Sequence, residues 1–249
     1  MSSNRIPCRS WGINQGEESF LGGKVGMIAL AGCSASCVFC YLGDGDGSHQ
    51  DWSVDQFVEA AEALRKRGAS CLYLVNPEAA FQKDLRAALF EVRRKAPSFP
   101  IVMKLGGHED LALSNNLRTL VDAISLDAKV FSNADAESFL GVADYPTRFA
   151  SNLAFWVNQT GFFRPDSNRI SGVWIRHLVL PGRAKSWGAG LEAMPDCQDL
   201  PVWVSLEYRP FWRARRHPIL GSKLNPGERS DALSIVSSLR ANGRQLWVE

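Results

Sequence analysis

Three of the six cysteines of the chain lie within eight positions of one another, in the segment GCSASCVFCYLG over residues 32–43. Cys33, Cys37 and Cys40 have the spacing C-x3-C-x2-C. Thiolates are ligands for zinc and for iron–sulfur clusters, and both kinds of structural site usually take four protein ligands. Three cysteines therefore indicate a cluster with one iron left free for a substrate or cofactor. A zinc ion completed by a distant histidine is the alternative.

The other cysteines are not expected to complete this site. Cys71 lies in a predicted buried strand, where a cysteine behaves as a small apolar residue. Cys197 lies in a predicted loop, and Cys8 lies near the N-terminus. The candidate metal ligands are therefore the three cysteines of the motif.

The elements that position these cysteines alternate between short apolar runs and amphipathic helical patterns. The first predicted strand, residues 24–32, ends directly before Cys33. Ser53 begins a predicted helix, with Gln56 three residues later in a capping-box arrangement. The further predicted strands are 70–75, 100–105, 123–130, 172–180, 201–208 and 245–249, and the further predicted helices are 81–96, 111–120, 146–161, 189–194 and 228–243.

This alternation predicts an α/β fold with parallel strands joined by right-handed crossovers. The chain holds about six such units, against the roughly eight of a complete TIM barrel. We expect a single domain over residues 1–249, with residues 1–15 as a loosely ordered N-terminal extension. Active sites of parallel sheets and barrels lie at the carboxyl ends of the strands, so the cysteine segment is predicted to lie at that mouth.

Composition excludes several classes of function. The 249 residues carry a formal net charge of +2, which gives no argument for a nucleic-acid partner. No window approaches the roughly 20 apolar residues of a bilayer span, and the N-terminus MSSNRIPCRSWG has no apolar signal region. We therefore expect a cytoplasmic location, where thiols stay reduced and clustered cysteines favour metal or redox work.

The cysteine motif is also the signature of a known superfamily. C-x3-C-x2-C directly after the first strand, with the aromatic Phe39 before the third cysteine, resembles the radical S-adenosylmethionine (radical SAM) superfamily. Further segments resemble its pyruvate formate-lyase activating enzyme-like subgroup, over roughly residues 14–245. They are GEESFLGGKVGMIALAGCSASCVFC (16–40), SLDAKV (125–130), ADY (143–145), IRHLVLPG (175–182) and VSLEYRP (204–210).

The resemblance implies a partial (β/α)6 TIM-like barrel of the radical SAM type and an oxidoreductase chemistry. In that superfamily the three cysteines hold a [4Fe–4S] cluster, and S-adenosylmethionine chelates the unique iron. An electron from a donor such as flavodoxin or ferredoxin releases a 5′-deoxyadenosyl radical, which abstracts hydrogen from the substrate. The cofactors implied are therefore the [4Fe–4S] cluster and S-adenosylmethionine.

The resemblance also assigns cofactor contacts after the second predicted strand. Relatives carry a Gly-Gly-Glu stretch there that supports the amino group of the methionyl moiety. The matching segment LVNPEAAF places Asn76 and Glu78 at that position without the glycines. An alternative for Glu78 is a favourable charge in the first turn of a helix.

Asp127 and Lys129 are spaced i, i+2 on a predicted strand, which points both side chains to one face. The resemblance implies that Lys129 contacts the carboxylate of S-adenosylmethionine and that Asp127 lies near the ribose or a bound cation. A plain salt bridge is the alternative. Lys104 ends the strand before, where relatives carry Asn or Asp, so it could neutralise Asp127 without a metal cation.

The strand over 172–180 and the one that follows supply the last expected contacts. By resemblance, Arg176 binds the carboxylate and Leu178 packs on the adenine, because both share the cofactor face. His177 on the other face is expected to be a core histidine. Tyr208 is expected to reach the adenosyl group, with ordinary core packing as the alternative. The run RPFWRARRHP over 209–218 is expected to be a surface loop with arginine stems on aromatic faces.

Three hypotheses for function follow. The first is a radical SAM enzyme that makes a glycyl radical on a partner protein. The second is radical modification of a small molecule or peptide in a biosynthetic pathway. The third is a zinc-binding or electron-transfer module without S-adenosylmethionine chemistry. Two departures from the subgroup weaken any inference of the substrate from its members. Only Cys8 remains of an N-terminal cysteine-rich stretch, and Tyr41-Leu42 stands where relatives often have Gln-Asn.

Overall fold

A computed structural model of the protein describes residues 5–43, 48–78, 83–194 and 199–249. These residues form one nine-stranded sheet in the order β3-β1-β2-β4-β5-β6-β7-β8-β9. Its central strands pair in parallel and form a partial (β/α)6 barrel, as predicted. They are β2 (Val25–Leu30), β4 (Leu72–Val75), β5 (Ile101–Leu105), β6 (Ala123–Asp127), β7 (Gly172–Leu178) and β8 (Val202–Ser205), with β9 (Leu246–Val248) added parallel to β8.

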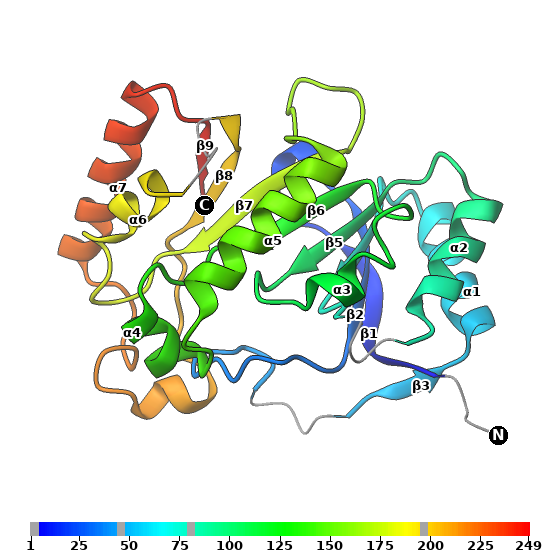
Figure 1. The fold of residues 1–249 in the computed structure, drawn as a ribbon, viewed down its shortest axis with the longest axis horizontal. Helices are drawn as coiled ribbons and strands as arrows, with labels where there is room; N and C mark the ends of the chain where they lie inside the picture. The colour runs from blue at the N-terminus through cyan, green and yellow to red at the C-terminus, as the bar shows by residue number, and fades with distance from the viewer. Residues whose placement is uncertain (1–4, 44–47, 79–82, 195–198) are drawn as a thin grey trace.

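Helices cover the outer face of the sheet (Figure 1). One pair of helices lies at one end of the sheet and a second pair at the other, with a long helix between them. In chain order they are α1 (Val54–Lys66), α2 (Leu85–Lys95), α3 (Leu111–Ser114), α4 (Asn133–Asp135), α5 (Tyr145–Thr160), α6 (Trp187–Glu192) and α7 (Pro226–Ala241). Within the described ranges, no helix has the length and apolar character that a membrane crossing requires.

The parallel strands are buried on both faces, which is why they read as continuous apolar runs. One large core lies between the outward side chains of the strands and the helices. A second, smaller core lies on the inner face and includes Tyr73, Val102 and Trp174. The short helix η1 (Ser19–Leu21) closes the inner core from the amino-terminal ends of the strands. Phe20 of this helix packs there against Phe163, Trp174, Trp203 and Trp247.

The expectation of a loosely ordered extension over residues 1–15 is wrong for its larger part. Residues Ile6–Asn14 form β1, which pairs antiparallel with β2 and with the short β3 (Gln50–Trp52). Ile6 and Cys8 are buried against the outer core. The strand has a register irregularity between Cys8 and Ser10, and only its first residues alternate cleanly between buried and half-buried positions. That short alternation is too weak a signal to predict a strand.

Several predicted elements end earlier than expected. The helix predicted over 111–120 stops at Ser114, and turns follow in which Asn116 N–H donates to the Leu113 carbonyl and Leu117 N–H to the Ser114 carbonyl. The strand predicted over 123–130 ends at Asp127, and the strand predicted over 201–208 ends at Ser205. The last two differences move Lys129 and Tyr208 from strands into loops.

Candidate active site

The cysteine loop follows β2 and crosses the carboxyl ends of the strands, along the lower edge of Figure 1. Backbone hydrogen bonds hold it on two sides. Ser36 N–H donates to the Leu140 carbonyl at 2.9 Å, and Val38 N–H donates to the Phe139 carbonyl at 2.8 Å, both in η2 (Ala136–Leu140), a π-helical turn. On the other side, Ala214 N–H of η4 (Trp212–Arg216) donates to the Val38 carbonyl at 2.8 Å. The loop is therefore clamped between two segments distant in sequence.

The three motif cysteines differ in exposure. Cys33 is exposed, Cys40 is half-buried and Cys37 is buried, and Cys40 N–H donates to the Cys37 carbonyl at 3.1 Å. Their sulfurs do not all lie within 4.8 Å of one another; among the described residues, the group of ligand atoms with that spacing contains Cys33 but neither Cys37 nor Cys40. Sulfurs around a single tetrahedral zinc would lie about 3.8 Å apart, given Zn–S bonds of about 2.3 Å. In this structure the three sulfurs are therefore not arranged around a single tetrahedral ion.

The other described cysteines are poor ligands. Burial raises the pKa of Cys8 to about 11 and the pKa of Cys71 to about 12. Cys71 is fully buried in the inner core, as the sequence predicted. Cys8 lies in β1 rather than in a loose terminus. The prediction for Cys197 falls outside the described residues.

Glu78 is committed to the start of the cysteine loop. Its two carboxylate oxygens accept from Ser34 N–H at 3.0 and 3.2 Å, and Oε1 lies 3.4 Å from His108 Nε2. Burial opposes ionisation of Glu78, but the contacts with His108 and Ser34 outweigh it and lower the pKa of this carboxyl. Glu78 therefore braces the loop, whereas the sequence pointed it at the methionyl amino group or at a helix end.

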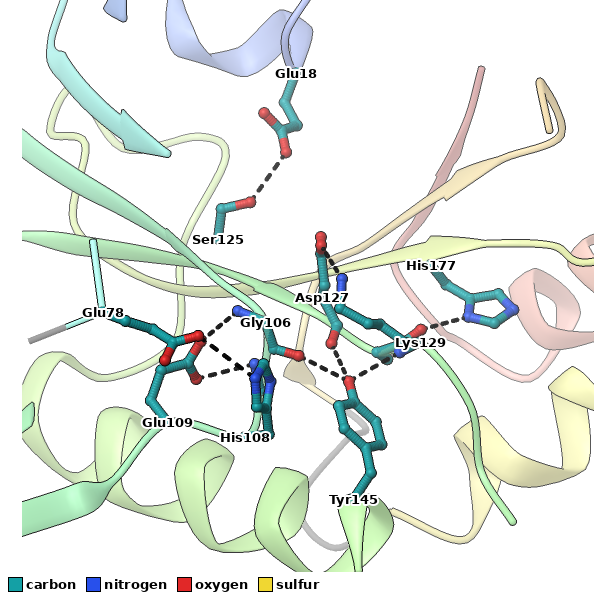
Figure 2. Close-up of polar contacts among 12 residues, drawn as sticks. Glu18, Glu78, Gly106, His108, Glu109, Ser125, Asp127, Lys129, Tyr145 and His177 are labelled. Atoms are coloured by element: carbon teal, nitrogen blue, oxygen red, sulfur yellow. Dashed lines mark hydrogen bonds and ion pairs between the residues drawn. The ribbon is translucent and has the colours of Figure 1, made fainter. Parts of the chain in front are cut away.

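His108 is a residue that the sequence did not single out. It lies after β5 in the turn GGHED. The two glycines before it, Gly106 and Gly107, donate their N–H groups to the Glu109 carboxylate (Figure 2). The ring is 2% exposed and lies between Glu78 and Cys33. Burial opposes protonation, but the adjacent Cys33 thiol and Glu78 carboxylate outweigh it and raise the pKa of His108 to about 10. A lone histidine in a loop gives no sequence signal of this placement.

Asn76 has a backbone conformation that explains the missing glycines. Its φ is 54°, in the left-handed region that favours glycine and that asparagine tolerates better than most residues. The segment after β4 therefore makes a left-handed turn at a residue other than glycine. This local geometry places Asn76 at the mouth, next to the end of β4.

Asp127 and Lys129 form an ion pair, with Lys129 Nζ 2.8 Å from Asp127 Oδ2 (Figure 2). The two residues do not share a strand face, because β6 ends at Asp127. The turn after it is held by Tyr145, the first residue of α5: its hydroxyl accepts from Lys129 N–H at 3.0 Å and lies 2.5 Å from the Asp127 carbonyl. Burial opposes ionisation of Asp127, but Lys129 and then Lys104 outweigh it and lower its pKa to about 2.

Arg176 faces inward from β7 but is already paired. Its Nη1 lies 2.7 Å from Glu17 Oε2 and 3.1 Å from Glu18 Oε1. Glu18 is buried and also accepts from Trp174 Nε1 at 2.8 Å and from Ser125 Oγ at 3.3 Å. The sequence did not identify the two glutamates, which read as ordinary charges before the first apolar run.

The remaining predicted contacts lie around the mouth. Leu178 is half-buried at the end of β7, on the same side as Arg176. Phe39 and Tyr208 meet edge to face with ring centroids 6.4 Å apart. The Tyr208 hydroxyl donates to the Leu220 carbonyl at 2.7 Å, and the ring is 2% exposed. Tyr208 thus packs as a core residue against Phe39, and its hydroxyl is used by the Leu220 carbonyl.

A cavity of about 440 Å³ opens beside Lys129, within the size range of small-molecule sites. Phe131, His177, Arg183 and Trp187 are among its lining residues. His177 is buried, and its Nδ1 lies 2.7 Å from the Ala128 carbonyl, as expected for a core histidine. Burial lowers its pKa to about 4.

No family model matches the chain, and no curated protein matches it in sequence. Solved structures resemble it in fold, and three of them are as follows. Streptococcus suis SuiB bound to the precursor peptide SuiA shares 9% identity at a TM-score of 0.62, over 87% of this chain and 46% of SuiB. SuiB bound to S-adenosylmethionine shares 11% identity at a TM-score of 0.62, over 87% of this chain and 48% of SuiB. A spore photoproduct lyase variant with bound AdoMet and dinucleoside spore photoproduct shares 12% identity at a TM-score of 0.56, over 96% of this chain and 79% of the lyase.

The chain thus spans about half the length of the SuiB chains it resembles. At these identities the likeness concerns the fold. It confirms the partial TIM-like barrel predicted from the sequence, with the cysteine loop at the carboxyl ends of its strands.

Proposed function

We propose that the chain is a radical SAM enzyme. The observation that carries the proposal is the clamped loop of Cys33, Cys37 and Cys40 at the mouth of a barrel whose fold is shared with proteins solved with S-adenosylmethionine. These three residues would hold a [4Fe–4S] cluster, because three thiolates leave one iron of the cube open to a cofactor. When bound, the cluster supplies the electron that cleaves the sulfonium of S-adenosylmethionine.

The residues of the chain then bind and orient the cofactor. Lys129 is the natural partner for the methionyl carboxylate, because its ammonium lies at the mouth and is held by Asp127 and by the Tyr145 turn. Arg176 already pairs with Glu17 and Glu18 through Nη1, so we assign the carboxylate to Lys129.

The other cofactor roles follow position. Asn76, in its left-handed turn, offers a backbone carbonyl or its amide to the methionyl amino group. Leu178 offers an apolar surface to the adenine at the end of β7. Phe39, supported by the Tyr208 ring, shapes the loop between Cys37 and Cys40. Glu78 acts indirectly, because it fixes the Ser34 backbone next to the first cysteine.

For the substrate, we propose a protein or peptide, with a glycyl residue of a partner enzyme as the first candidate. The resemblance of the sequence segments to activating enzymes supports the glycyl candidate, and the likeness to SuiB bound to a precursor peptide supports a peptide. Flavodoxin or ferredoxin is the proposed electron donor. The second candidate is a small molecule, which the cavity beside Lys129 is large enough to hold.

Anaerobic reconstitution with iron and sulfide tests the proposal. Cubane absorption together with dithionite-dependent release of 5′-deoxyadenosine supports the enzyme. A protein that holds one zinc tightly and cleaves no S-adenosylmethionine would instead be the metal-binding module. A glycyl-radical signal in the presence of a candidate partner separates the first substrate candidate from the second.

A further inference from the structure

Cys33, Glu78 and His108 form a compact group at the start of the cysteine loop. Their sulfur, oxygen and nitrogen ligand atoms all lie within 4.8 Å of one another, although they come from three separate segments, after β2, β4 and β5. Glu78 and His108 are 5% and 2% exposed, whereas Cys33 is exposed. The group is therefore anchored in the protein and open to solvent on one side.

The spacing within the group matches a tetrahedral metal. His108 Nε2 and Glu78 Oε1 are 3.4 Å apart. Two ligands at about 2.0–2.1 Å from a tetrahedral zinc lie about 3.4 Å apart, so the pair already has the length of one edge of the coordination tetrahedron. One thiolate, one carboxylate and one neutral imidazole also balance the charge of a divalent cation.

Packing and hydrogen bonds around His108 fix the position of its imidazole ring. A Cβ on Gly106 would lie 2.7 Å from His108 Cε1, so only glycine leaves room for the ring in this position. Glu109 fixes the same turn through Gly107 N–H at 3.0 Å, and the Asn152 amide donates to the Glu109 carbonyl at 3.1 Å. The ring is thus rigidly oriented toward Glu78 and Cys33.

Two features of the polar groups point to a ligand. Both ring nitrogens of His108 are buried, and neither makes a well-aligned hydrogen bond in the part of the chain that the structure describes. Ser34 N–H donates to both carboxylate oxygens of Glu78, at 3.0 Å to Oε1 and at 3.2 Å to Oε2, and this single donor leaves lone pairs of the carboxylate that can face a cation. A bound metal would satisfy an imidazole nitrogen that is otherwise buried without a good partner.

We propose that Cys33, Glu78 and His108 bind one divalent cation of the zinc class when the iron–sulfur cluster is absent. Three protein ligands leave the fourth position to water, on the exposed side of Cys33. The binding itself rests only on these three residues. Its consequence rests on the proposed function: because Cys33 is shared, the divalent cation and the cluster exclude each other.

Titration of the anaerobic, cluster-free protein with Co²⁺ alone tests the site. The expected result is one equivalent bound, with a thiolate-to-cobalt charge-transfer band and ligand-field bands of tetrahedral intensity, both removed by Zn²⁺. Cys33→Ala should abolish the charge-transfer band. His108→Ala should weaken Co²⁺ binding by at least about 100-fold, since even residues outside the coordination sphere contribute 10–100-fold. Glu78→Gln is the second variant, should His108→Ala fail to fold by circular dichroism.

The matched controls are Cys37→Ala and Cys40→Ala, which should keep the cobalt spectrum. Loss of the spectrum in these two variants, or its survival in both His108→Ala and Glu78→Gln, would overturn the proposal. Cluster assembly gives the reciprocal pattern: Cys37→Ala should lose it, and Zn²⁺ should slow it in the native protein but not in His108→Ala. A protein that binds Co²⁺ as described yet never assembles a cluster would refute the proposed function and leave this site standing.

Discussion

The hydroxyl of Tyr145 supports the turn that carries Lys129, so Tyr145→Phe tests whether that turn matters. The side chain is fully buried, and its oxygen lies 3.0 Å from Lys129 N–H and 3.0 Å from the Gly106 carbonyl. Removal of the oxygen leaves the Lys129 N–H without a partner in a buried place. An orphaned buried donor costs about 1–3 kcal/mol, so we expect the free energy of unfolding to fall by about 2 kcal/mol.

Urea unfolding followed by circular dichroism measures that loss. With a slope of about 2 kcal/mol per molar urea, the midpoint should fall by about 1 M. Tyr41→Phe is the matched control, because Tyr41 is 57% exposed and surface changes usually stay within about 0.5 kcal/mol. Equal midpoints for the two variants would refute the role of the hydroxyl. Calorimetric titration of S-adenosylmethionine into the cluster-loaded Tyr145→Phe protein should also show weaker binding, because the Lys129 turn relaxes.

The remaining predictions concern a cofactor ligand, a buried histidine and a buried cysteine. Lys129→Ala should weaken S-adenosylmethionine binding about tenfold or more while iron content stays unchanged, and equal loss of both would contradict the assignment. The pKa of His177 is lowered to about 4, so between about pH 6.5 and 4 the unfolded chain binds a proton that the folded protein excludes, and stability falls as pH falls. From about pH 7 to 5 the loss should be roughly 2 kcal/mol in urea unfolding, and His177→Gln should remove that share of the slope. Cys71→Ala should leave cluster absorption intact, since the thiol is buried away from the loop; loss of absorption in a folded variant would refute this.

The barrel was predictable from the sequence because its strands are buried on both faces. Runs such as residues 72–75 are apolar throughout, and no polar periodicity competes with that signal. Local chemistry was equally readable: Ser53 and Gln56 form both hydrogen bonds of the expected capping box at α1. These features depend on neighbours within a few residues, which a sequence shows directly.

Contacts between distant segments were not predictable in the same way. Glu17 and Glu18 lie far from Arg176 in sequence, and only the fold brings them together. The strand end at Asp127 depends on the Tyr145 hydroxyl, which comes from the following helix. His108 reaches Glu78 only because β4 and β5 are neighbours in the sheet. In each case the missing information was tertiary.

The central claim is that Cys33, Cys37 and Cys40 hold a [4Fe–4S] cluster that acts on S-adenosylmethionine. The most direct measurement is 5′-deoxyadenosine release by the anaerobically reconstituted, dithionite-reduced protein, compared with the three single Cys→Ala variants. We predict release by the native protein and none above background by any of the variants. Release that persists in one of the variants, or none from an iron-loaded native protein, would contradict the account.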